Sequence, residues 1–211
     1  MEIVGLTKEN ILKISNIKKE DKWIQDFRLK GYKSFMKQRN PSFGPNINLD
    51  YDNIIYYKSN EVDKKIENDW NNVLKPVVDE LDGLGVLESE KHLGGMGVQY
   101  ESEVIYHNML EELESKNVIF TSIENAIKNH KDLVEKYFGK IVNMNENKFA
   151  ALNSAVFSGG SFIYIPKNTH LDRPLQSYFR INSKNMGQFE RTLIIVDDNS
   201  SLHYVEGCTT P

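Results

Sequence analysis

Apolar side chains recur at helical spacing through much of the first 140 residues. Four stretches place an apolar side chain every three or four positions, as a helix with one buried face requires: 24–35, 106–113, 123–127 and 133–138. Ser122 precedes the third stretch as an N-cap residue, and Gly139 follows the fourth as a C-terminal stop. This pattern predicts that the region is mostly helical.

Two segments of this region depart from helical spacing. Residues 50–57 (DYDNIIYY) are rich in aromatic and β-branched side chains, which predicts a short strand. Residues 83–100 are rich in glycine, which predicts a loop. We therefore expect a few short strands among the helices.

From about residue 148 the chain changes to short runs of β-forming residues: SFIYIP, LQSYFRI, FERTLIIVDD and SLHYVEG. Turn-forming residues separate these runs, and no helical pattern lies between them. Such spacing is typical of a sandwich, a barrel or a β-solenoid, and periodicity does not choose among these. The sequence thus predicts an α+β protein, with a mainly helical region over 1–145 and a β region over 146–211. Few repeats fit before Pro211, so we expect the fold to be truncated there.

Composition argues against several classes of protein, namely nucleic-acid-binding, membrane-spanning and disulfide-rich proteins. Hydrophobic residues make up 39% and charged residues 27% of 211 residues, and the net charge is -4. Such a chain lacks the clustered basic charge of a nucleic-acid-binding protein. Its basic pairs, such as Lys18-Lys19, are interleaved with acidic residues, and we interpret them as solvated faces. The longest aliphatic run, 193–196, is too short to cross a membrane, and the first residues show no secretory signal. A single cysteine, Cys208, excludes an internal disulfide or a cluster site built from this chain's cysteines alone.

Several strings of residues are distinctive enough to compare with known families. In the second half these are LNSAVFSGGSFIYIP (152–166), YFRINSKNMGQFERTLIIVDD (178–198) and HYVEGCTTP (203–211). FRLKGYKSF, NPSFGP, DYDNIIYY and LGGMGVQYESEVIYHN precede them. In this order, over nearly the whole chain, they resemble the N-terminal part of the SufB family, scaffold subunits of SUF-type iron–sulfur cluster assembly.

The resemblance implies a fold and a set of partners. Residues 146–211 would form the first rungs of a right-handed parallel β-helix. The expected partners are a SufC-like ATPase, a SufD-like subunit, and a cysteine desulfurase with its sulfur-transfer partner. Family members continue well past this chain, into a later catalytic cysteine and the segment that docks the ATPase. An iron–sulfur cluster would be assembled only transiently, on the full-length complex, and the protein would be a scaffold and not an enzyme.

Cys208 is the first candidate site residue. A lone cysteine usually packs as a small buried side chain. A thiolate, however, is the nucleophile in sulfur transfer and can carry sulfur as a persulfide. Cys208 lies in an EGCT motif, and the resemblance implies that this cysteine passes sulfur from the donor toward the cluster site.

Arg180 and Asn182 are the second candidates. They lie two residues apart on a predicted strand, so their side chains point to the same face. Residue type alone favours a solvent-exposed face, the usual place for arginine. The resemblance implies instead that this FRIN motif belongs to the sulfur path through the β-helix.

Other polar residues give weaker signals. We interpret Glu190 and Arg191 as structural, because charges beside strands are commonly paired or solvated. Glu206 lies two residues before Cys208, and a carboxylate there would raise the pKa of the thiol. The five histidines show no metal-binding spacing, and no phosphate-binding loop motif is present.

Two further functions remain open at this point. One is a non-catalytic, SufD-like β-solenoid interaction subunit. The other is a cupin-like metalloenzyme, suggested by GGSFIYIPKNTH but opposed by the lack of paired histidines. The expected location is the cytoplasm, with a plastid-type organelle as the alternative.

Overall fold

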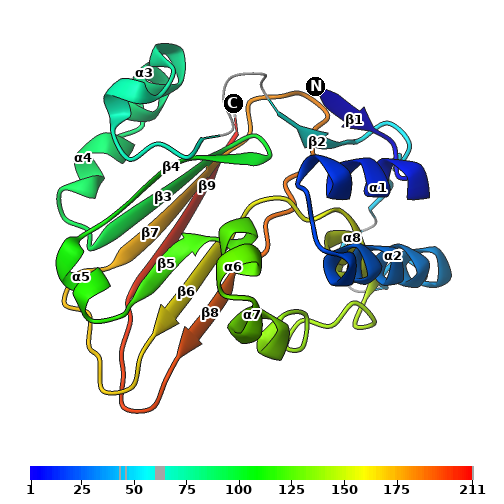
Figure 1. Cartoon of the computed structure of the whole chain (residues 1–211). Helices are drawn as coiled ribbons and strands as arrows, with labels where there is room; N and C mark the ends of the chain where they lie inside the picture. Colours follow the sequence, from blue (N-terminus) through cyan, green and yellow to red (C-terminus); the bar gives the residue numbers. More distant parts are fainter. Residues whose placement is uncertain (43, 46, 60–64, 211) are drawn as a thin grey trace.

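A computed structural model describes residues 1–42, 44, 45, 47–59 and 65–210 of the chain. These residues form a mixed α+β fold, with three small sheets and helices that cover them (Figure 1). The smallest sheet pairs β1 (Glu2–Val4) with β2 (Ile55–Lys58) in antiparallel fashion. The predicted strand at 50–57 is therefore confirmed in its second half.

The larger sheets contain strands from distant parts of the chain. The four-stranded sheet has the order β4 (Glu103–Met109), β3 (Gly95–Tyr100), β7 (Leu175–Arg180), β9 (Tyr204–Thr209). The three-stranded sheet has the order β5 (Ile119–Ser122), β6 (Ser161–Ile165), β8 (Leu193–Val196). Both sheets therefore combine strands from before and after residue 145, whereas a domain boundary at that position stays a prediction.

Eight α-helices and a short 3-10 helix lie in the described part of the chain. They are α1 (Lys8–Ile17), α2 (Lys22–Lys37), η1 (Trp70–Asn72), α3 (Lys75–Gly83), α4 (Val86–Glu90), α5 (Glu111–Ser115), α6 (Ile123–Asn129), α7 (Lys131–Tyr137) and α8 (Lys148–Val156). The predicted helices at 24–35, 123–127 and 133–138 are confirmed. Ser122 caps α6 by accepting a hydrogen bond from the Asn125 N–H, and Gly139 adopts a φ of +67° after α7.

Residues 83–113 differ from the prediction. The expected loop at 83–100 contains α4 and the buried strand β3. The first half of the expected helix at 106–113 lies in strand β4, and only its last three residues lie in helix α5. The three-residue spacing of Tyr106 and Met109 suits a helix, but in a strand it sends the two side chains to opposite faces. Both faces of β4 are covered, since Tyr106 stacks on Trp70 and Met109 packs against the opposite core cluster. Tertiary packing therefore overrides the local spacing.

The segment that begins at residue 148 also differs in part. We expected nearly continuous β-structure, but Lys148–Val156 forms helix α8. Asn147 caps it by accepting hydrogen bonds from the Phe149 and Ala150 N–H groups. Beyond this helix the prediction is confirmed in part, because residues 160–206 are all described and contain strands and no helix, with turns and irregular segments between the strands.

Helix α8 packs closely against α2 where α2 carries Gly31. A Cβ atom at residue 31 would lie 2.8 Å from the Ala155 nitrogen and 2.8 Å from the Ser154 Cβ. These are closer than real Cβ contacts, and two of the three nearest atoms belong to the backbone, which cannot rotate away. The glycine therefore allows the two helices to approach each other.

We expect Gly31→Ala to destabilise the chain by about 1–3 kcal/mol, because the added methyl group forces α2 and α8 apart. Thermal unfolding measures the loss. Gly83→Ala is the matched control, since no atom lies within 4 Å of a Cβ at that position of α3. Equal melting temperatures for the two variants would show that α2 and α8 are not in close contact.

Parallel pairing sets up a repeat in the second half of the chain. β6 pairs in parallel with β8, and β7 pairs in parallel with β9. At the turn that follows β6, the Asn199 side chain donates to the Asn168 side chain, 31 residues earlier, and both residues have positive φ. Two successive passes of the chain therefore run parallel and side by side. Figure 1 shows β9 next to β7 in this arrangement.

The two larger sheets pack face to face. Leu175 of β7 belongs to the same core cluster as Ile163 and Ile165 of β6 and Phe120 of β5. On the other side of β7, Tyr178 packs with α3 and α4. We call the side of the four-stranded sheet that faces the three-stranded sheet its inner face, and the side that carries α3 and α4 its outer face.

Candidate functional site

Cys208 lies on β9, at the edge of the four-stranded sheet, and its side chain is exposed. In the parallel register it pairs with Phe179 of β7, which is buried on the inner face. Paired residues of adjacent strands point to the same face, so the thiol belongs to the inner face. Glu206, two residues earlier on β9, shares that face. In this chain the thiol is exposed to solvent.

Arg180, at the end of β7, points to the outer face. Its guanidinium donates from Nε and Nη2 to Glu80 Oε1 of α3, at 2.9 and 2.5 Å. Its Nη1 donates to Thr209 Oγ1 at 3.1 Å. Only 8% of the residue is exposed, so Arg180 is a buried ion-pair partner and not a member of a solvent-exposed face.

Asn182 joins the same network from the loop after β7. Its side chain donates to the Tyr100 hydroxyl at 2.9 Å, and that hydroxyl donates to Glu80 Oε2 at 3.4 Å. Arg180 and Asn182 therefore meet through Glu80 and Tyr100, in agreement with the shared face that their spacing predicts. Burial raises the pKa of the Tyr100 phenol, which keeps this hydroxyl protonated near neutral pH.

The sheet separates Cys208 from Arg180. The guanidinium contacts Thr209, the neighbour of Cys208 on β9, and that side chain points to the opposite face from the thiol. A direct effect of the Arg180 charge on the thiol would have to act through the sheet. Arg180 is instead placed to hold the end of β9 against β7 and α3.

Glu190 and Arg191 have different surroundings. Arg191 has the structural role that we predicted, because its guanidinium donates to the side chains of Asn153 and Ser154 and to the Val142 carbonyl. The Oε2 atom of Glu190 is buried and has no hydrogen-bond partner among the described residues. Burial raises the pKa of Glu190, and burial followed by the negative charge of Glu190 raises the pKa of Glu206. No spacing pattern along the chain indicates that these two carboxyl groups lie near each other.

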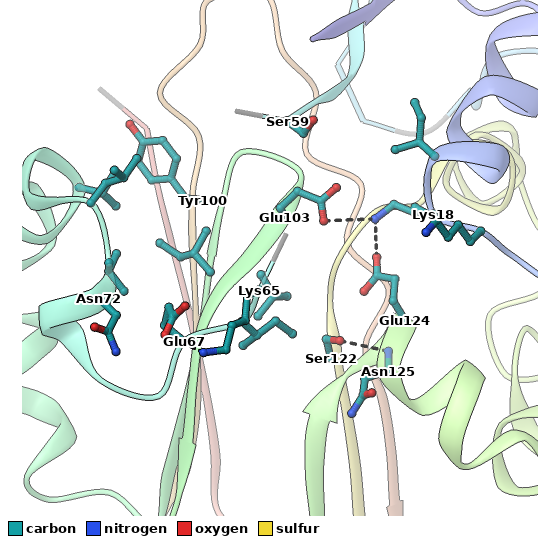
Figure 2. Close-up of a pocket in the computed structure, with 18 of the residues that line it drawn as sticks. Lys18, Ser59, Lys65, Glu67, Asn72, Tyr100, Glu103, Ser122, Glu124 and Asn125 are labelled. Atoms are coloured by element: carbon teal, nitrogen blue, oxygen red, sulfur yellow. Dashed lines mark hydrogen bonds and ion pairs between the residues drawn. The ribbon is translucent and has the colours of Figure 1, made fainter. Parts of the chain in front are cut away.

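A cavity of about 480 Å³ lies between the β3–β4 hairpin and helices α1 and α6 (Figure 2). Lys18 reaches its wall with a side chain that is only 4% exposed, and its Nζ lies 2.8 Å from Glu124 Oε1 and 3.8 Å from Glu103 Oε2. Burial opposes the charge of Lys18, but the two carboxylates outweigh it and hold the pKa of Lys18 above its usual value. We had interpreted the Lys18-Lys19 pair as a solvated face, and for Lys18 this was wrong.

The described part of the chain lacks two other kinds of site. No helix within it combines the length and the apolar character needed to span a membrane. Nor do three or more of its His, Cys, Asp or Glu side chains gather as a metal site.

Known proteins are similar to this chain in sequence. Residues 18–177 match the SufBD protein N-terminal region. An iron–sulfur cluster assembly SufBD family protein of Staphylococcus aureus (strain USA300) is 52% identical over 209 residues, and one of Staphylococcus epidermidis is 51% identical over 209 residues. Each alignment covers 98% of this chain but 44% of the relative, so the chain spans less than half the length of these relatives. By this match and this identity, the chain belongs to the SufBD family of iron–sulfur cluster assembly proteins.

Proposed function

We propose that this chain acts as the N-terminal part of a SufB-like scaffold, which accepts sulfur at Cys208 and helps to build nascent clusters. The observation that carries the proposal is the position of Cys208. The only cysteine of the chain is exposed on an edge strand, inside the EGCT motif by which the chain resembles SufB. An exposed thiol can reach the persulfide of a donor protein, as thiol exchange requires.

The parallel strands support a β-solenoid as the architecture of the second half. β6 and β7 would form one coil, and β8 and β9 the next, stacked in the register described above. A longer family member would continue as a right-handed β-helix by adding strands to the open edges of β8 and β9. Unpaired edges of this kind invite further strands.

The partners belong to the same proposal. A cysteine desulfurase with its transfer partner would deliver sulfur to Cys208. A SufC-like ATPase and a SufD-like subunit would bind elsewhere on the full-length protein. The second candidate function is a SufD-like subunit without sulfur chemistry, which the match to the SufBD protein N-terminal region supports equally.

Direct detection of sulfur distinguishes these two functions. Full-length protein is incubated with a cysteine desulfurase, its transfer partner and cysteine, and is then digested and analysed by mass spectrometry. We expect additional sulfur on the peptide that carries Cys208. A SufD-like subunit would leave that peptide unmodified while the donor protein carries its persulfide.

We expect Arg180→Ala to slow sulfur acceptance by about tenfold, because charge-assisted hydrogen bonds each contribute about 1.5–3 kcal/mol and one of them holds Thr209 beside Cys208. The rate of sulfur uptake measures the effect. Glu80→Gln is the matched variant, since it removes the charge of the ion-pair partner but keeps the guanidinium. Equal losses in both variants indicate that the ion pair positions β9, and full activity in both would exclude Arg180 from the site.

A further inference from the structure

The cavity beside Lys18 has two walls of different character (Figure 2). Residues 65–74 form one wall, and they contribute the apolar side chains of Ile66, Val73 and Leu74. The opposite wall comes from the end of α1 and from α6, and its side chains are mostly charged or polar. The volume of about 480 Å³ lies within the range of about 300–1,000 Å³ that is usual for small-molecule sites.

The apolar wall presents large side chains that the protein itself leaves uncovered. Ile66 is 37% exposed and Leu74 is 44% exposed, and both line this cavity. Trp70, which lies between them in the chain, holds the segment in place. Its ring stacks on Tyr106 with 3.8 Å between the centroids, and its Nε1 donates to Glu90 Oε2 at 2.7 Å. A fixed segment therefore offers an apolar surface to the cavity, and covering that surface would be favourable.

Lysines outnumber carboxylates on the walls of the cavity. The lining lysines are Lys18, Lys19, Lys65 and Lys128, and the lining carboxylates are Glu67, Glu103 and Glu124. Each carboxylate already has a lysine partner: Glu67 lies 3.7 Å from Lys65, and Glu103 and Glu124 lie 3.8 and 2.8 Å from Lys18. Among the described residues, Lys19 and Lys128 form no such ion pair. The walls therefore keep positive charge that their own carboxylates do not neutralise.

These two lysines flank the buried ion pair of the polar wall. Lys19 follows Lys18 in the chain, and Lys128 lies one helical turn after Glu124 on the same face of α6. The 2.8 Å contact between Lys18 Nζ and Glu124 Oε1 joins the two segments. Both Lys19 and Lys128 are exposed. An acid group at this wall would therefore find two accessible ammonium groups while the buried pair stays intact.

We propose that the cavity binds a small organic anion. Its apolar body covers Ile66 and Leu74, and its acid group pairs with Lys19 and Lys128. An organic cation is disfavoured, because the carboxylates of the walls are already paired with lysines. The site includes β4, whereas Cys208 lies on β9 at the opposite edge of the four-stranded sheet. The inference is therefore independent of sulfur acceptance.

Two dyes that share one aromatic body serve as probes. 8-Anilinonaphthalene-1-sulfonate carries an acid group, and N-phenyl-1-naphthylamine has the same rings without it. The fluorescence of both dyes rises in an apolar site, so titration into full-length protein gives their dissociation constants. Comparison of the two dyes in each variant separates the contribution of the acid group from that of the apolar body.

The double variant Lys19→Gln with Lys128→Gln tests the polar wall. We expect it to weaken binding of the sulfonate about fivefold, the size expected from two exposed ion pairs, and to leave binding of the neutral amine unchanged. Lys167→Gln is the matched control, because Lys167 is exposed and does not line the cavity. Unchanged binding of the sulfonate, or an equal loss for both dyes, overturns the pairing with the two lysines.

Leu74→Ser tests the apolar wall. We expect it to weaken binding of both dyes, by about threefold or more, because the dyes lose the apolar surface that they cover. Leu74 is exposed, so the substitution removes little from the core. Binding of both dyes with wild-type affinity would overturn the placement of the apolar body.

Lysine acetylation shows where the sulfonate binds. At a dye concentration of about four times its dissociation constant, we expect acetylation of Lys19 and Lys128 to slow about fivefold, because the reagent reacts only with the unoccupied site. Acetylation of Lys167 should keep its rate. Mass spectrometry of the digested protein measures each lysine separately. Equal acetylation of Lys19 and Lys128 with and without the dye overturns the site, even if the dye binds elsewhere on the protein.

Discussion

Full-length protein that carries Cys208→Ser is expected to keep its fold and its partners. Its rate of sulfur uptake should fall by far more than tenfold, because the serine hydroxyl cannot form a persulfide. Serine is close to cysteine in size, since only an oxygen replaces the sulfur. The substitution should therefore disturb little packing. The loss of activity would then be chemical and not structural.

The measurement is the amount of sulfur on the peptide with residue 208 after incubation with the desulfurase and its transfer partner. Cluster formation on the complex with the ATPase and the SufD-like subunit is followed in parallel. Thr209→Ser serves as a control beside the cysteine, because it keeps a hydroxyl within reach of Arg180. Normal sulfur uptake and normal cluster assembly by Cys208→Ser would show that Cys208 has no role in sulfur transfer.

Arg28→Met is expected to cost about 3–5 kcal/mol of stability, because it leaves a buried carboxylate without its partner. The Arg28 side chain is 0% exposed and that of Glu20 is 4% exposed. The guanidinium donates to both carboxylate oxygens, at 2.7 and 2.5 Å, and to the Ala155 carbonyl at 3.2 Å. It also lies over the Phe157 ring, 3.9 Å from the centroid. One side chain thus joins α2 to the end of α8.

Thermal or urea unfolding measures this loss, which corresponds to a fall in melting temperature of about 10 °C. Lys13→Met is the matched control, because the Lys13–Glu9 pair is exposed and such pairs contribute at most about 1 kcal/mol. The double variant Arg28→Met with Glu20→Leu should recover part of the loss by removing the unpaired charge. A cost below about 1 kcal/mol for Arg28→Met would show that water reaches the carboxylate.

Signals that are local in the chain predicted local structure well. Ser122 and Gly139 mark helix ends in the sequence and in the structure, because capping depends on neighbouring residues only. Each of the four predicted runs of β-forming residues after residue 160 contains a strand in the structure. The sequence motifs also indicated a resemblance to SufB. The match to the SufBD protein N-terminal region agrees with that resemblance at the level of the family.

Strand β3 shows why the glycine-rich segment was misread. Gly95, Gly97 and their neighbours look like a loop, but β3 is buried on both faces and lies between two other strands. A Cβ at Gly95 would lie 3.0 Å from Phe120 and 3.0 Å from the Asn108 carbonyl. The glycines give room to side chains that come from distant parts of the chain, and no local pattern contains that information.

By itself, the sequence determined where α6 begins and α7 ends, where the later strands run, and which family the chain resembles. Tertiary structure alone decided that Arg180 and Cys208 lie on opposite faces of one sheet, that Lys18 is buried between two carboxylates, and that Glu190 lies near Glu206. The physical reason is that spacing along a chain records the period of each element but not its partner. Strand register and helix packing bring together residues that are far apart in sequence, and these contacts set the burial and charge of each site.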